Sequence, residues 1–294
     1  MPDFGLRAII VLLVGAAIGM AITVGIERRG REEQLVGGSV HPLTTVEPAA
    51  PTAAHGANDG YADSTAKGKV AAIYYGWLID EHGQPNTAAQ RLAAGQPEMI
   101  IAAGYTDQPR RNNLPSAVRV LFHNAHTRIA VYIPTDFGRR PLKQVQFEVT
   151  ELAEDVDGIF LDEVAPNFDP PTWTYYVTIA AQIRAAGKLV IANPGVAAID
   201  ERMMDIADIV MLEHQWAQFT SETGWRVKYP PDRFMGVSSN EPHAARELGH
   251  KLDARQAEAD TKRAWAAGIG WHYSCSRYTQ VPSWYIAYMR AVRA

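Results

Sequence analysis

Residues 158–164 read GIFLDEV, an uncharged run that ends on two adjacent carboxylates, Asp162 and Glu163. The run is typical of a buried strand, whereas burying either carboxylate unpaired would cost several kcal/mol. Because side chains alternate along a strand, the two carboxylates cannot face the same way while the strand stays regular. The sequence therefore predicts a strand whose burial stops where its carboxylates begin.

GIFLDEV is one of eight similar apolar runs that begin at Lys69. These short runs are rich in β-branched and aromatic residues, and they alternate with segments that can hold helices. The clearest helix is expected at 172–186, where apolar residues follow an i, i+3, i+4, i+7 spacing and Gly187 ends the pattern. The interval after the sixth run is the weakest, since Gly224 and Pro230-Pro231 leave room for little more than a turn or two. The eight predicted strands are 69–77, 98–105, 128–135, 157–164, 188–195, 208–216, 233–240 and 268–275.

Eight strand-then-helix units in 226 residues, 69–294, predict an α/β fold, the (β/α)8 TIM barrel. A doubly wound open sheet is the alternative, but no Gly-x-Gly-x-x-Gly or P-loop sequence follows any of the runs. In a barrel the carboxyl ends of the strands meet at one mouth, where active sites lie. The carboxylates of GIFLDEV would then emerge at that mouth.

The N-terminal part of the chain differs from this domain. Residues 8–26 are 19 residues without a charge, about the length that crosses ~30 Å of hydrocarbon as a helix. We expect an uncleaved single-pass membrane anchor within 1–33, followed by a flexible Ala/Pro/Thr-rich linker at 34–68 and the barrel domain at 69–294. The barrel is expected at the cell membrane on the extracytoplasmic side, although three arginines just after the span favour the opposite orientation.

Composition excludes several classes of function. A net charge of -4 gives no electrostatic footprint for nucleic acid. Cys275 is the only cysteine, which excludes an internal disulfide and every multi-cysteine metal site. The histidines lack ligand spacing, so neither a metal nor a cofactor is expected. The expected partners are a polysaccharide substrate and, through the N-terminal helix, a membrane.

A second carboxylate, Glu213, stands in the sixth run at the same relative place as Asp162 in the fourth. Inward side chains from these strands could bring the carboxyl groups ~5 to 9 Å apart, the arrangement of a glycosidase. The alternative is structural, because an Asp-Glu pair after a strand is also common as a helix N-cap or a surface ion pair. Aromatic faces stack on sugar rings, and their polar tips bond hydroxyl groups. The candidate substrate-binding residues at the other strand ends are Tyr74, Tyr75, Trp77, Tyr132, Asn193, His214, Trp216, Trp271, His272 and Tyr273.

Four segments together resemble the spherulin-4-like family, which is related to endo-acting α-1,4-galactosaminidases and N-acetylgalactosaminidases. They are GIFLDEV, ANPG at 192–195, the glutamate of IVMLEHQW, and YIPTDFGRRPLKQV at 132–145, and the likeness covers about 69–290. The family usually carries an Asn-Pro-x-x-Gly-Pro turn after the second strand. This chain has AAGYTDQPRRNN at 102–113 instead, which puts the substrate subsites of that loop in question.

The resemblance implies a (β/α)8 hydrolase that cuts galactosamine-containing exopolysaccharide internally, with Asp162, Glu163 and Glu213 at the family's acidic positions. Our hypothesis makes Glu213 the general acid, Asp162 the nucleophile or the stabiliser of an oxocarbenium-like centre, and Glu163 a positioning or amine-binding group. If the 2-acetamido group of the substrate attacks, Asp162 would orient it. Two alternatives stay open: a non-catalytic carbohydrate-binding surface protein on the same barrel, and a barrel enzyme of different chemistry on a cytoplasmic substrate.

Overall fold

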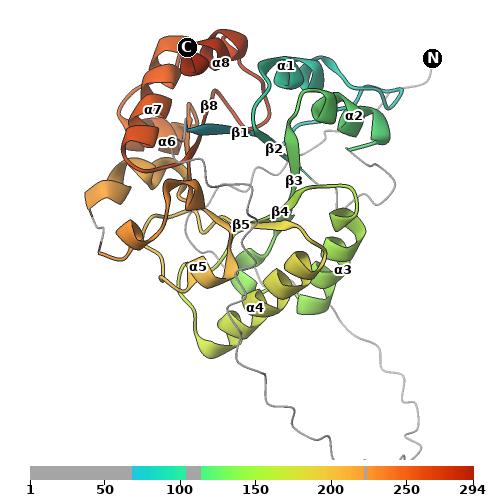
Figure 1. Ribbon diagram of the computed structural model, residues 1–294, viewed down its shortest axis with the longest axis vertical. Coiled ribbons are helices and arrows are strands. Elements are labelled where there is room, and N and C mark those ends of the chain that lie inside the picture. Colours follow the sequence, from blue (N-terminus) through green and yellow to red (C-terminus); the bar gives the residue numbers. More distant parts are fainter. Residues whose placement is uncertain (1–67, 104–113, 222–223) are drawn as a thin grey trace, which may run out of the picture. The chain divides into compact units, whose positions relative to one another are not determined.

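A computed structural model describes residues 68–103, 114–221 and 224–294. Its eight strands are all parallel and close into a barrel in chain order, with β8 paired to β1 (Figure 1). The predicted α/β barrel is confirmed, and the doubly wound sheet is wrong. The strands are β1 (Lys69–Tyr74), β2 (Met99–Ala103), β3 (Arg128–Pro134), β4 (Gly158–Asp162), β5 (Leu189–Ala192), β6 (Ile209–Met211), β7 (Phe234–Ser239) and β8 (Trp271–Cys275).

Helices lie outside the ring of strands, as Figure 1 shows. Their buried sides cover the strands, which are apolar and buried along most of their length, as expected for a parallel barrel. The α-helices are α1 (Thr87–Gly95), α2 (Ser116–Asn124), α3 (Leu142–Ala153), α4 (Pro170–Ala185), α5 (Met203–Ile206), α6 (Pro242–Leu248), α7 (Ala254–Ala266) and α8 (Tyr285–Arg293).

Helix α4 shows how local sequence sets these elements. Asp169 caps its N-terminus by accepting a hydrogen bond from the Thr172 N–H at 2.9 Å, and Pro170 fits the first turn. Gly187 follows the helix with φ +72°, a conformation that costs glycine little. The helix predicted at 172–186 is therefore confirmed, and its buried residues are Tyr175, Tyr176, Ile179, Ala180 and Ile183.

The segment between β6 and β7 contains only 3₁₀ turns among its described residues, as the sequence indicated. These are Glu213–Ser221, Arg226–Lys228 and Pro231–Arg233. All eight strands end before the predicted boundary or at it, and β6 stops at Met211. Glu213 therefore lies just beyond its strand, in the loop at the mouth.

The predicted anchor and most of the predicted linker lie outside the described residues. Among the residues that are described, every helix is too short or too polar to span a bilayer. Anchor, linker and domain boundaries remain predictions.

Candidate active site at the mouth of the barrel

Asn193 joins the two predicted catalytic carboxylates. Its side-chain Nδ2 donates to Oδ1 of Asp162 at 2.6 Å and to Oε1 of Glu213 at 2.8 Å. These two oxygens are therefore at most about 5.4 Å apart, the limit that the two bond lengths allow. Oδ1 of Asn193 accepts the N–H of Gly195 at 2.9 Å, which fixes the direction of the amide. The two carboxyl groups therefore face each other across a single amide, close enough to act on one bond as a pair of carboxylates in a glycosidase does.

The backbone turns sharply at both strand ends. Glu163 has φ +52° and Glu213 has φ +44°, in the left-handed region that non-glycine residues rarely adopt. Asp136 and Phe137, in the loop after β3, also have positive φ. Four of the six such non-glycine residues among the described parts of the chain thus gather in three mouth loops. Backbone strain of this kind persists where surrounding contacts hold it, and it concentrates at functional sites.

Thr135 supplies part of that support. Its buried Oγ1 lies 2.9 Å from the carbonyl oxygen of Asp162 and 2.8 Å from that of Glu163. The hydroxyl of Tyr176, on α4, is 2.9 Å from the same Oγ1 and accepts the N–H of Ala165 at 3.1 Å. Because these contacts tie the end of β4 to β3 and α4, the carboxylates are held on a rigid part of the barrel.

The surroundings of Asp162 disfavour its ionised form. Burial raises the pKa of Asp162, and the nearby charge of Glu213 raises it further. Hydrogen bonds from Tyr132 and Asn193 oppose that shift in the Asp162 pKa. Burial and Asp162 in turn raise the pKa of Tyr132, so its hydroxyl stays neutral and able to donate. Burial, then Asp162 and Asp136, raise the pKa of Glu163.

Two predicted substrate-binding tyrosines lie beside this pair. The ring of Tyr75 meets that of Tyr132 edge to face at 5.1 Å. Burial and then the charge of Asp162 raise the pKa of Tyr75, followed by contributions from Tyr132 and Glu213. Tyr75, Tyr132 and Asn193 are therefore brought together around the carboxylates, and their contact with a substrate stays a prediction.

His214 has a different position from the one expected. Its ring is buried, with Nε2 3.7 Å from Oε2 of Glu213 and Nδ1 3.3 Å from the carbonyl oxygen of Val237. It therefore lies beside the candidate acid, and its buried ring presents no open face to a sugar.

Sequence reasoning missed Tyr278. It lies in the loop after β8, and its ring is 5.4 Å from that of Tyr75. Burial and then Glu213 raise its pKa. The only sequence signal was an aromatic residue three positions beyond the last predicted strand, and the path of a loop cannot be read from alternation.

Three predicted mouth residues lie elsewhere, so their assignment to the mouth is wrong. Trp271 is the first residue of β8, at the end of the barrel away from the mouth, where Nε1 donates to the carbonyl of Asp232 at 2.9 Å. His272 is fully buried, with Nδ1 2.9 Å from the hydroxyl of Thr261 on α7. Trp216 is also buried, with its ring 5.1 Å from that of His272. The position of His272 follows from the alternation of side chains along β8, which directs this ring outward, toward α7.

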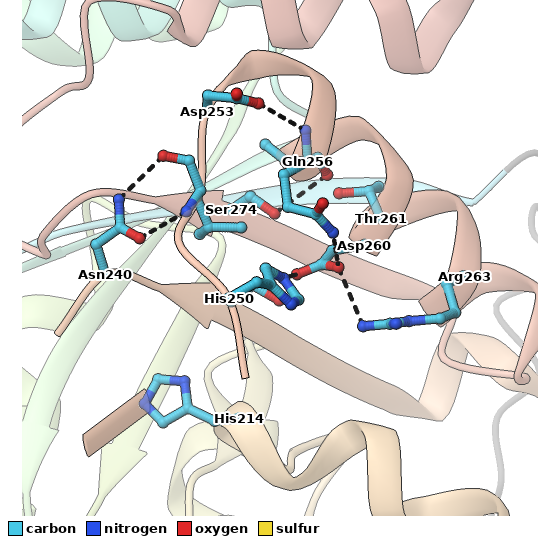
Figure 2. Close-up of polar contacts among 12 residues, drawn as sticks. His214, Asn240, His250, Asp253, Gln256, Asp260, Thr261, Arg263 and Ser274 are labelled. Carbon is cyan, nitrogen blue, oxygen red and sulfur yellow. Dashed lines mark hydrogen bonds and ion pairs between the residues drawn. The ribbon is translucent and has the colours of Figure 1, made fainter. Parts of the chain in front are cut away.

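The region between β8 and α7 contains a second buried polar cluster. Asp260, completely buried on α7, accepts from Gln256 at 3.1 Å and from Arg263 at 3.0 Å, and His250 Nε2 lies 2.8 Å from it (Figure 2). Burial lowers the pKa of nearby His272 to about 3, so that imidazole is neutral. No group of three or more His, Cys, Asp or Glu side chains in the described part of the chain is arranged to hold a metal ion.

The remaining candidates give less information. Tyr74 and Tyr273 are buried, and the groups that raise the pKa of Tyr273 after its burial are Cys275 and other tyrosines rather than the carboxylate pair. Trp77 is half-buried in the loop after β1, where its carbonyl accepts from Asn86 Nδ2 at 2.7 Å. Its contact with a substrate remains a prediction.

Comparison with solved structures places this fold among known barrels. Aspergillus clavatus Sph3 in complex with GalNAc has 15% identity and a TM-score of 0.56, covering 77% of this chain and 98% of that one. A Chromobacterium violaceum chitinase has 12% identity and a TM-score of 0.50, with 77% and 99% covered. The Bacillus cereus spore cortex-lytic enzyme SleL has 11% identity and a TM-score of 0.50, with 76% and 74% covered.

A search of curated proteins found no match. The family model for spherulation-specific family 4, Spherulin4, matches residues 102–292, which is more than half of the sequence. This match includes all three acidic positions and the asparagine that bridges two of them. The chain belongs to spherulation-specific family 4.

Proposed function

We propose that this protein is a glycoside hydrolase that cleaves α-1,4-linked galactosamine or N-acetylgalactosamine polymer internally. The observation that carries the proposal is the pairing of Asp162 and Glu213 through the amide of Asn193. Two carboxyl groups this close can share the reaction. One attacks the anomeric carbon, and the other protonates the leaving glycosidic oxygen. The GalNAc bound by Sph3, a barrel of similar fold, supports an amino sugar as the substrate class.

In the first step Glu213 gives its proton to the glycosidic oxygen as the C1–O bond breaks. An oxygen of Asp162 bonds to C1, and the shortened polymer leaves as an alcohol. Water then attacks C1, Glu213 takes its proton, and the bond to Asp162 breaks. Asn193 donates a hydrogen bond to each carboxylate, and these bonds hold the two groups in position during both steps. If the 2-acetamido oxygen attacks C1 instead, Asp162 orients that group.

Glu163 supports recognition of a free amine. It is partly exposed beside the pair, and its neighbours include Asp136, whose carboxylate is 2.5 Å from Arg139. A bound ammonium would relieve the repulsion among Asp162, Glu163 and Asp136 that raises the pKa of Glu163. We assign Glu163 to binding or positioning the 2-amino group of a deacetylated residue.

Cleavage is tested with partly deacetylated poly-α-1,4-galactosamine, by measuring new reducing ends and the sizes of the products. Short oligomers from early time points are expected of an internal cut. Binding of the polymer without any new reducing ends would contradict the hydrolase and favour the alternative, a carbohydrate-binding surface protein on the same barrel.

We place the barrel outside the cytoplasm, tethered at the cell membrane by residues 1–33, because a polymer of this kind is met at the cell surface. The test is protease treatment of intact cells. Loss of the 69–294 domain is expected, whereas protection until the cells are lysed would favour the cytoplasmic orientation and a different substrate.

A further inference from the structure

Phe137, in the loop after β3, exposes an aromatic ring at the mouth of the barrel. It is 42% exposed, and it is one of four large apolar side chains that the described part of the chain exposes. Leaving such a ring in water forgoes the free energy of burying it. Phe147 is also exposed, but it lies within the regular helix α3, where a single exposed apolar residue is ordinary. Phe137 differs because its backbone is unusual as well.

The backbone at Phe137 is held in a strained conformation. Its φ is +54° and its ψ is +34°, in the left-handed region that bulky residues rarely adopt. The N–H of Phe137 donates to the carbonyl oxygen of Glu163 at 2.7 Å, and the N–H of Gly138 donates to that of Thr135 at 3.0 Å. Strain of this kind persists only where surrounding contacts hold it. These bonds therefore fix the exposed residue beside the end of β4 that carries the carboxylates.

The groups around the ring suit a sugar. The guanidinium carbon of Arg139 lies 5.4 Å from the ring centre, and its Nη2 donates to Oδ1 of Asp136 at 2.5 Å. These contacts limit the motion of the ring before a ligand arrives, which lowers the entropy cost of binding. Asp136 and Glu163 are partly exposed, and their carboxylates accept hydrogen bonds. A flat apolar surface bordered by acceptors matches a pyranose, which has C–H groups on its faces and hydroxyl groups at its rim.

The position of Phe137 in the ring of strands fits a substrate longer than one sugar. The strands follow one another around the barrel in chain order, so the loop after β3 lies on the opposite side of β4 from β6. Phe137 is therefore on the side of Asp162 that faces away from Glu213. A polymer that is cut internally extends beyond the cleaved bond in both directions, and the ring lies along one of these directions.

We propose that the ring of Phe137 stacks on a sugar unit of the polymer, next to the unit bound between Asp162 and Glu213. A galacto-configured sugar suits this contact, because the axial oxygen on its fourth carbon leaves an uninterrupted patch of C–H groups on the other face. This inference rests on the proposed function, since it takes the mouth as a polysaccharide site. It adds a binding surface that the carboxylate pair does not provide.

The test compares Phe137→Ala with Phe147→Ala in the full-length protein. Both changes remove an exposed phenyl ring, so both should alter Tm little. Only Phe137→Ala should raise KM for partly deacetylated poly-α-1,4-galactosamine, by about tenfold, the order of one lost aromatic contact, with a smaller change in kcat. Phe137→Tyr keeps the flat ring and should have a KM close to that of the wild type.

Wild-type KM in Phe137→Ala would overturn the inference, and so would an equal rise of KM in Phe147→Ala. If Phe137→Ala melts several degrees lower than the wild type, Phe137→Leu decides, because leucine keeps an apolar side chain without a flat ring. A raised KM with wild-type Tm in Phe137→Leu supports stacking. A wild-type KM, or a lowered Tm in Phe137→Leu as well, assigns the ring to the fold and overturns the inference.

If the wild-type protein cleaves no polymer, calorimetry with galactosamine oligomers replaces the rate assay. An affinity about tenfold weaker in Phe137→Ala, with Phe147→Ala unchanged, then supports the inference while the hydrolase fails. Equal affinity in Phe137→Ala and the wild type overturns the inference. A wild-type protein that neither cleaves nor binds these sugars overturns both.

Discussion

Two carboxylates in this barrel, Asp260, which is buried, and Asp162, which is half-buried, have opposite surroundings. Asp260, on α7, is bonded by the cationic side chain of Arg263, by Gln256 and by His250. Asp162, at the mouth, is bonded by the neutral side chains of Asn193 and Tyr132 and has the charge of Glu213 nearby. The first carboxylate is therefore paired with a cation, whereas the second lies near a charge of its own sign.

The difference separates a structural cluster from the candidate active site. Around Asp260 and His272 the polar atoms are paired with one another between a strand and a helix, so the cluster is complete without a ligand. At the mouth, Glu163 and Glu213 keep left-handed backbone conformations, and the pKa of Asp162 is raised. Proteins accept such costs where a ligand or a reaction uses them.

The largest effect is expected from neutralising the mouth carboxylates. Asp162→Asn and Glu213→Gln keep the shape of each side chain but remove the nucleophile and the acid, and each should lower polymer cleavage by about 10² to 10⁴ or more. Glu163→Gln should cost less, with more of the loss in apparent affinity. Reducing-end assays and binding measurements on the three variants provide the comparison. Near-normal cleavage in Asp162→Asn and Glu213→Gln, together with a lower Tm, would make the mouth a structural cluster too.

Asn193→Ala should have the next largest effect. The change removes the amide that holds both carboxylates, so we expect about a 10- to 100-fold loss of kcat, as for a misplaced catalytic group. Little change in Tm is expected, because two like charges can move apart once the bridge is gone. Steady-state kinetics and thermal melts measure both effects. A large fall in Tm with normal turnover would show that Asn193 serves the loop, through its bond to Gly195.

Asp260→Asn should have the opposite effect, a loss of stability with unchanged activity. Loss of the charge weakens the bonds from Arg263 and His250, and the expected cost is about 1 to 2 kcal/mol of unfolding free energy, reduced because Arg263 is half exposed. Activity per folded molecule should match the wild type, since the cluster faces α7 rather than the mouth. Urea denaturation and active-site-normalised rates measure the two quantities. A loss of rate without a loss of stability would show that the two regions are coupled.

The smallest effect is a pH-dependent difference in stability between Asp162→Asn and the wild type. Because the folded pKa of Asp162 is raised above its ordinary 3.8, the ionised form destabilises the fold at neutral pH, and Asn removes that cost. Asp162→Asn should therefore melt higher at pH 7. The difference should shrink as pH falls through the raised pKa and vanish below 3.8, where both side chains are neutral. Melting curves from pH 3 to 8 test this, and a lower Tm for Asp162→Asn at pH 7 contradicts it.

The sequence alone predicted the barrel and the strand ends at which the candidate carboxylates lie. The eight strands appear in the sequence as apolar runs separated by intervals long enough for a helix. A buried parallel strand requires uncharged residues, so each strand can be recognised from its own residues and ends where polar residues begin. The same signal located Asp162, Asn193 and Glu213 at strand ends, and the closed ring brought them within hydrogen-bonding distance.

Only the tertiary structure decided which aromatic residues reach the mouth. Trp271 and His272 were predicted at the mouth. Trp271 lies at the opposite end of the barrel because β8 begins there, and the His272 side chain points toward α7 because side chains alternate along the strand. Tyr278 was invisible because a loop has no period. The left-handed turns at Glu163 and Glu213 were equally hidden, since they depend on contacts such as those of Thr135 that join residues far apart in the chain. Strand burial is a property of neighbours in sequence, whereas the direction of a side chain beyond the strand is set by neighbours in space.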